Sequence, residues 1–120
     1  MREILFRGKN LLGKWITGDL LQYLGCGKRH IVQQYKGAGG QEVDPSTVGE
    51  YTGLKDKNGK MIFEGDIVLL KGDEEPYQVE FDECCFQVYS HSVCYVMDNF
   101  YDHDIEVIGN IHDNPELLKG

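Results

Sequence analysis

The absence of any long helical stripe most constrains the fold of this chain. Apolar residues recur in short segments separated by glycine and asparagine, and no window keeps a helical period beyond about ten residues. This pattern predicts a mainly β protein. The expected strands are Glu3–Arg7, Lys14–Tyr23, His30–Gln34, Val48–Thr52, Asp66–Lys71, Tyr77–Phe81, Cys85–Ser90 and Ile105–Asn110, with turns at Gly8-Lys9-Asn10, Gly25–Lys28, Asn58-Gly59 and Gly72-Asp73.

The segment after Gly65 has the order of elements with which small SH3-like barrels commonly begin. A Gly65-Asp66 corner leads into an apolar strand, a polar loop and the alternating strand Tyr77–Phe81. A chain of 120 residues can form one compact domain. We therefore expect a single domain over 1–120, in which an N-terminal β lobe (1–50) packs on an SH3-like barrel (51–112) and a short tail (113–120) follows.

Two segments could form short helices. Val93–Met97 is apolar on every side, so it is either a buried strand or one buried helical turn. In the tail, Asn114 can cap a helix that has Pro115 at its first position and Glu116 beside its positive end. The tail is therefore expected to form a helical turn.

The charge and cysteine pattern restrict the partners and the compartment. Twelve basic and twenty acidic residues give a net charge of -8, which argues against nucleic-acid binding apart from a local patch at Lys28-Arg29-His30. The charged start and the lack of about 18 consecutive apolar residues predict no signal peptide, no membrane segment and a cytoplasmic protein. No C-x-x-C pair occurs, so reduced thiols are expected at Cys26, Cys84, Cys85 and Cys94.

Two glycine-containing stretches resemble ligand-binding loops and fail on spacing. An EF-hand loop counted from Asp56 has Lys60 at its fifth position and Ile67 at its twelfth, where ligands are needed. Asn58-Gly59 instead fits a tight hairpin turn, with Met61–Phe63 as one flank. The stretch Gly8–Lys14 matches most of a P-loop, but Trp15 stands where the serine or threonine should be. A plain β-hairpin connection is expected there.

Two further sets of residues could carry chemistry. Imidazole and carboxylate ligands suit divalent metals, but the spacing of the candidate set matches no ligand motif, and a solvated acidic loop is the expected interpretation. That set is Asp98, Asp102, His103, Asp104 and His112. A thiolate–imidazole pair could join His91 to a nearby cysteine, although nothing adjacent in sequence would lower the pKa of the thiol. We expect no catalytic residue, no bound metal and no cofactor.

Long strings of residues resemble the YopX family. They run from Val48 to Lys60 (VGEYTGLKDKNGK), from Ile62 to Val68 (IFEGDIV) and from Glu106 to Ile111 (EVIGNI), followed by Asn114–Leu118, and Arg2–Arg7 fits the opening of the family. The resemblance implies a small protein of phages and prophages, without an established activity, and a mainly β fold with an SH3-like barrel. The conspicuous residues of these strings are interpreted as a fold signature: Tyr51, Gly53, Asp56, Asn58, Gly59, Gly65 and Asp66.

The expected function is noncatalytic binding of an unknown protein partner or of other copies of the chain. Seven of the thirteen aromatic residues fall between Tyr77 and Tyr101, and a small barrel buries one face of such strands. A homo-oligomer is therefore expected, with Tyr95, Phe100, Tyr101, Leu117 and Leu118 as possible interaction residues. The alternatives are a nucleic-acid-linked role, as a binder through Lys28–Lys36 or as an acidic mimic, and a metal-dependent enzyme using the Asp98–His112 region.

Overall fold

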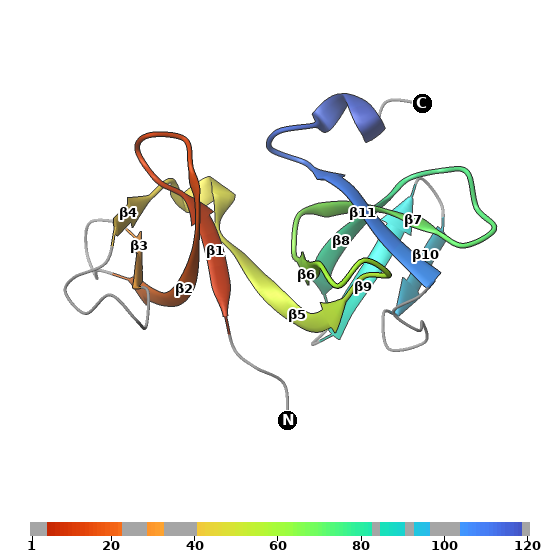
Figure 1. The fold of residues 1–120 in the computed structure, drawn as a ribbon, viewed down its shortest axis with the longest axis horizontal. Helices are drawn as coiled ribbons and strands as arrows, with labels where there is room; N and C mark the ends of the chain where they lie inside the picture. Colours follow the sequence, from red (N-terminus) through yellow and green to blue (C-terminus); the bar gives the residue numbers. More distant parts are fainter. Residues whose placement is uncertain are drawn as a thin grey trace. The chain divides into compact units, whose positions relative to one another are not determined.

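The protein is built from short antiparallel strands that form two compact units, Met1–Tyr51 and Thr52–Gly120 (Figure 1). A computed structural model describes residues 5–22, 29–32, 41–82, 85–90, 93–96 and 104–118. Over these ranges the chain forms strands and two short 3-10 helices, with no α-helix. The prediction of a mainly β protein is confirmed. That the units act as one domain stays a prediction.

Four antiparallel strands make up the N-terminal unit, in the order β4-β3-β2-β1. They are β1 (Phe6–Lys9), β2 (Trp15–Gln22), β3 (Arg29–Val32) and β4 (Gln41–Val43), and the start of β5 (Gly49–Lys55) joins β1 with Phe6 opposite Glu50. Ile16 and Val43 form the buried centre, which Phe6, Leu20 and Val48 surround. The 3-10 helix η1 (Pro45–Thr47) is capped by Asp44, whose side chain accepts from the Ser46 N–H at 3.0 Å.

The first strand lies further along the chain than expected, because Gly8 and Lys9 belong to β1 and the turn begins at Asn10. Gly8 lies against Val43: a Cβ at this position would be 3.0 Å from two Val43 side-chain atoms. The glycine therefore permits a close approach within the sheet and does not mark a turn.

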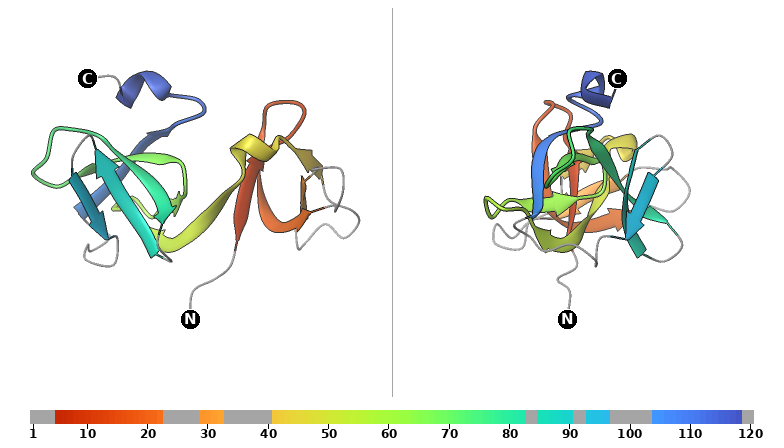
Figure 2. Two further views of the ribbon diagram at one scale, coloured as in Figure 1. Left: turned by 180° about the vertical axis from the view of Figure 1, so that it is seen from behind. Right: turned by 90° about the vertical axis from the view of Figure 1, so that its right-hand side faces the viewer.

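In the C-terminal unit, five antiparallel strands form a sheet in the order β10-β9-β8-β7-β11, and β6 (Met61–Phe63) pairs with β5. The five strands are β7 (Asp66–Leu70), β8 (Tyr77–Asp82), β9 (Cys85–Ser90), β10 (Val93–Val96) and β11 (Ile105–Asn110). Their colours, green to blue, trace them in both views of Figure 2. The core consists of Ile62, Val68, Leu70, Tyr77, Val79, Phe86, Val88 and Ile105.

This sheet does not close into the expected barrel. Along the described part of the chain, β10 pairs with β9 alone, so the sheet keeps an open edge there. Within the same ranges, β11 pairs as a strand with β7 alone, and its other edge is bonded to the turn after β5: the Lys57 N–H donates to the Ile105 carbonyl and the Val107 N–H donates to Asp56. Alternating apolar residues predict which face of a strand is buried, whereas closure depends on tilt and stagger between strands, which a sequence pattern does not encode. The ambiguous Val93–Met97 forms the strand β10, and the tail forms the expected helical turn, η4 (Pro115–Leu118).

Candidate functional site

The fold-signature residue Asp56 joins the Asn58-Gly59 turn to β11. Its side chain is 3% exposed. Oδ1 accepts the N–H groups of Asn58 and Lys60, and Oδ2 accepts the Val107 N–H, each at 2.9 Å. Burial by itself would raise the pKa of this carboxyl, but the three N–H donors and the Lys60 charge outweigh burial and hold the pKa below its ordinary value. The three donors to this carboxylate therefore all belong to the C-terminal unit.

The rest of the fold signature shapes the same region of backbone. Asp66 is 1% exposed, and its Oδ2 accepts the Phe63 N–H at 2.7 Å across the β6–β7 corner. Gly53, Gly59 and Gly65 have φ values of 88°, 82° and 93°, in the left-handed region that favours glycine. Tyr51 is buried, and Asn58 is exposed at the turn. Tyr51 and Gly65 also make long-range backbone hydrogen bonds, to Leu5 and to Val79 and Ile111, so the fold signature ties distant strands together.

Several sequence-predicted residues lie outside the described ranges. These are Asp98, Asp102 and His103 of the metal set, His91, Cys26, Cys84, Lys28, Phe100 and Tyr101. For four further residues the structure describes the strand backbone but not the side chain: Cys85, Cys94, Arg29 and His30. Where side chains are described, no group of three His, Cys, Asp or Glu residues converges. The metal and thiol hypotheses stay untested, as does the basic patch.

The stretch that resembled a P-loop is the tip of the β1–β2 hairpin, as expected. Lys9 lies opposite Trp15 in the antiparallel pair. Asn10 Oδ1 accepts the N–H groups of Leu12 and Lys14, both at 2.9 Å, and the Asn10 N–H donates to the Lys14 carbonyl at 2.9 Å. Gly13 completes the turn with φ of 81°. We call residues 10–14 the hairpin tip.

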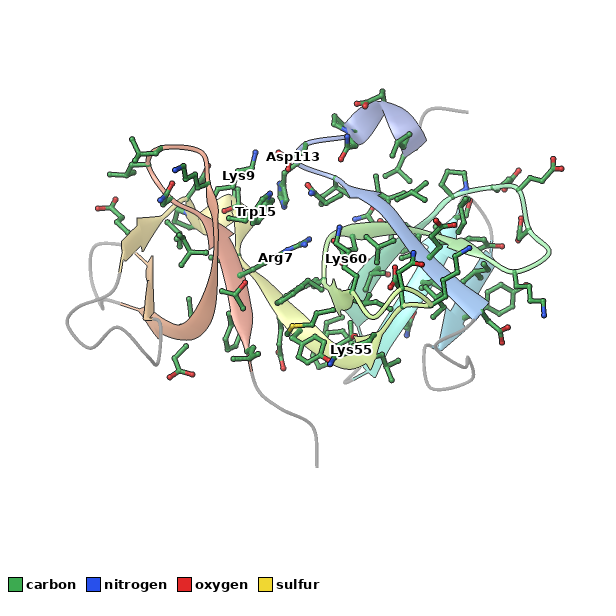
Figure 3. All side chains as sticks on the ribbon, viewed as in Figure 1. Arg7, Lys9, Trp15, Lys55, Lys60 and Asp113 are labelled. Atoms are coloured by element: carbon green, nitrogen blue, oxygen red, sulfur yellow. The ribbon has the colours of Figure 1, made fainter. Side chains whose placement is uncertain are left out.

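Two leucines project from the hairpin tip into solvent. Leu11 is 77% exposed and Leu12 is 81% exposed. Below them, Trp15 is half-buried, with the Arg7 guanidinium carbon 4.6 Å and the Lys9 ammonium 5.5 Å from its ring centroid. Such distances fit cation–π contacts, and Figure 3 shows the three side chains on the same side of the hairpin. The hairpin thus carries two apolar side chains at its tip and a cluster of two basic side chains and one aromatic ring next to the tip.

A groove of about 290 Å³ lies in the C-terminal unit between the β8–β9 pair and η4. Its lining residues are Glu75, Pro76, Gln78, Tyr89, Ser90, Leu117 and Leu118. The Tyr89 hydroxyl donates to Gln78 Oε1 at 3.0 Å. Burial, and secondarily the charge of Glu80, raises the pKa of Tyr89. We call this hollow the η4 groove: its floor is largely apolar, and two of the five possible interaction residues, Leu117 and Leu118, line it.

Acidic residues lie in the loop between β7 and β8, and one of them, Glu75, lines the η4 groove. Ser90 Oγ approaches Glu75 Oε2 at 3.4 Å, and the Glu75 N–H donates to Asp73 Oδ1 at 3.1 Å. The Tyr77 hydroxyl donates to Asp73 Oδ2 at 2.6 Å. This hydrogen bond, followed by burial and nearby negative charge, raises the pKa of Tyr77 to about 12. Among these acidic residues, Glu75 places a negative charge in the lining of the groove.

A second hollow, of about 370 Å³, lies along β7 and β11. Charges of both signs line it, and Lys57 Nζ lies 3.2 Å from Glu106 Oε1. Asp104, from the candidate metal set, also lines this hollow. Because opposite charges already face one another here, the η4 groove is the stronger candidate for a binding site.

Sequence reasoning singled out Leu117 and Leu118 but missed the hairpin tip and the other groove residues. A signal for the tip was available, since two adjacent leucines inside an Asn-to-Gly turn have no strand neighbour to bury them. The groove left no such signal, because Pro76, Tyr89 and Leu117 are far apart in sequence. Tyr95, on the edge strand β10, is 43% exposed, and its ring centroid lies 6.0 Å from that of Tyr77.

Comparisons with known proteins extend these observations to a family. The crystal structure of protein EF1440 from Enterococcus faecalis has a similar fold: the TM-score is 0.65 at 23% identity, over 98% of this chain and 99% of that one. None of the curated proteins matches the chain significantly. Over the described ranges, no helix is long and apolar enough to span a membrane. The sequence model of the YopX protein family matches residues 5–119, and the chain therefore belongs to this family.

Proposed function

We propose that this YopX protein acts without catalysis, by binding another protein or further copies of itself, as an accessory protein encoded by a phage or prophage and working in the cytoplasm of the bacterial host. The η4 groove carries the proposal. Its floor is lined by Leu117, Leu118 and Pro76, and Tyr89 and Gln78 offer polar groups at its side. Mostly apolar concave surfaces with a few placed polar groups are typical binding sites.

The open edge of the five-stranded sheet supports the same function. β10 has a partner strand on one side, among the described residues, and presents the exposed ring of Tyr95. Unpaired strand edges are sites where another chain can add a strand. A protein that offers an edge and an apolar groove in one unit has two surfaces suited to polypeptide partners.

Two measurements test the proposal, one for each kind of partner. Light scattering over a dilution series detects association between copies, and affinity capture from phage-infected cells detects other proteins. The matched variant is Leu118→Asp, which places a charge in the η4 groove, with Glu74→Ala as an exposed control in the same unit. We expect association or capture to fall for Leu118→Asp and to persist for Glu74→Ala. A mass of 13.7 kDa at every concentration, with identical captured proteins for both variants, would contradict the proposal.

A further inference from the structure

The two units of the chain carry opposite net charges. Met1–Tyr51 contains seven basic and five acidic residues, a net charge of +2, whereas Thr52–Gly120 contains five basic and fifteen acidic residues, a net charge of -10. Together they account for the -8 of the whole chain. Between two copies, each of net charge -8, a contact of an N-terminal unit with a C-terminal unit is thus the pairing that charge favours most.

Within the basic unit, the hairpin tip is a preorganised apolar projection. The Asn10 side chain holds the backbone of Leu12 and Lys14, so little conformational freedom remains to be lost on binding. Both leucines are more than three-quarters exposed, and Lys14 beside them is exposed as well. A surface that receives this tip must be apolar and must carry a negative charge for Lys14.

The η4 groove in the acidic unit has those two properties. Leu117, Leu118 and Pro76 supply apolar lining, and Glu75 supplies a negative charge. Its volume of about 290 Å³ corresponds to roughly ten water molecules at about 30 Å³ each. Two leucine side chains, with eight carbon atoms between them, can fill such a space, whereas a large cofactor cannot.

We propose that Leu11 and Leu12 at the hairpin tip of one copy insert into the η4 groove of a second copy, with Lys14 placed beside Glu75 of the receiving copy. The proposal rests on the proposed binding function and names the partner as another molecule of this chain. The contact joins two different surfaces, so it is head-to-tail and produces a closed ring or an open chain of copies. Each copy offers one tip and one groove.

Two variants that each lose one half of the contact provide the test. Leu11→Ser/Leu12→Ser removes the tip and keeps the groove, and Leu118→Asp blocks the groove and keeps the tip. We expect wild-type protein to associate in light scattering over a dilution series reaching about 100 µM, and either variant alone to associate at least about tenfold more weakly. An equimolar mixture of the two variants should form a species of two chains, twice 13.7 kDa, that grows no further.

Thr17→Ala, an exposed position on β2 outside the tip, serves as the matched control and should associate like the wild type. Circular dichroism and the fluorescence of Trp15, the single tryptophan, verify that each variant is folded. A charge exchange adds a second line of evidence: Lys14→Glu and Glu75→Lys should each weaken association, and a mixture in which these opposite charges can meet should recover it.

Four results would overturn the inference. If wild-type protein associates and Leu11→Ser/Leu12→Ser associates equally well, copies bind through another surface, and the proposed function survives. If the protein stays monomeric but captures a partner through the η4 groove, the inference likewise fails and the proposed function survives. Monomeric protein that co-sediments with anionic lipid vesicles through Leu11 and Leu12 would assign the tip to a lipid surface. A monomer that captures nothing would remove both the inference and the proposed function.

Discussion

Replacing Asp56 by alanine should be among the most destabilising changes in the C-terminal unit. The substitution removes the acceptor of three backbone N–H groups, from Asn58, Lys60 and Val107. A hydrogen bond to a charged group contributes about 1.5–3 kcal/mol. Asn58 and Lys60 lie in an exposed turn where water can replace the carboxylate, whereas Val107 is half-buried on β11. We therefore expect a loss of about 2–4 kcal/mol in the free energy of unfolding.

Urea unfolding followed by far-UV circular dichroism measures this loss. With a slope of about 2 kcal/mol per molar urea, the midpoint should fall by roughly 1–2 M. Asp56→Asn keeps an oxygen for the turn but directs an amide N–H toward the Val107 N–H, so its effect should be intermediate. The control is Glu74→Ala, an exposed carboxylate in the same unit, which should leave the midpoint unchanged. If Asp56→Ala unfolds at the same urea concentration as Glu74→Ala, the three bonds do not stabilise the fold and the reasoning is refuted.

Three further predictions concern single groups. The pKa of Asp56 is lowered in the folded state, so its contribution to stability is full above the ordinary carboxyl pKa and disappears as the pH falls through the folded value. The difference in unfolding midpoint between wild type and Asp56→Asn should therefore shrink between pH 7 and about pH 3. A constant difference would argue against this role of the charge. Ultraviolet titration should show Tyr77 ionising at about pH 12, and Asp73→Asn should return its pKa toward the ordinary tyrosine value; an unchanged titration would mean that the hydrogen bond is not its main cause. Gly59→Ala should lower the free energy of unfolding by about 1 kcal/mol, because φ is 82° at this position, whereas nothing lies within 4 Å of the added Cβ. Calcium should raise the melting temperature of neither the wild type nor this variant.

The sequence by itself determined the features that depend on neighbouring residues. Short alternating segments predicted a mainly β chain, and the strands Cys85–Ser90 and Ile105–Asn110 have the expected bounds. Asn58-Gly59 forms a turn, and Asn114 precedes a helical turn that begins at Pro115. These features follow from backbone preferences of single residues and from the two-residue period of a strand, which are local properties. The family was recognisable for the same reason, since its longest strings occupy these turns and corners.

The tertiary structure alone decided which distant segments meet. Asp56 bonds to Val107 across 51 positions, and β4, too short to be expected, exists because Arg29–Val32 pairs with it. The η4 groove brings Pro76, Tyr89 and Leu117 together, and the five-stranded sheet remains open where the sequence suggested a barrel. Pairing, closure and concave surfaces depend on register and packing between segments, and many such arrangements are compatible with one alternating pattern. The candidate site is made of these long-range contacts, so the sequence could name two of its leucines but not the groove that they line.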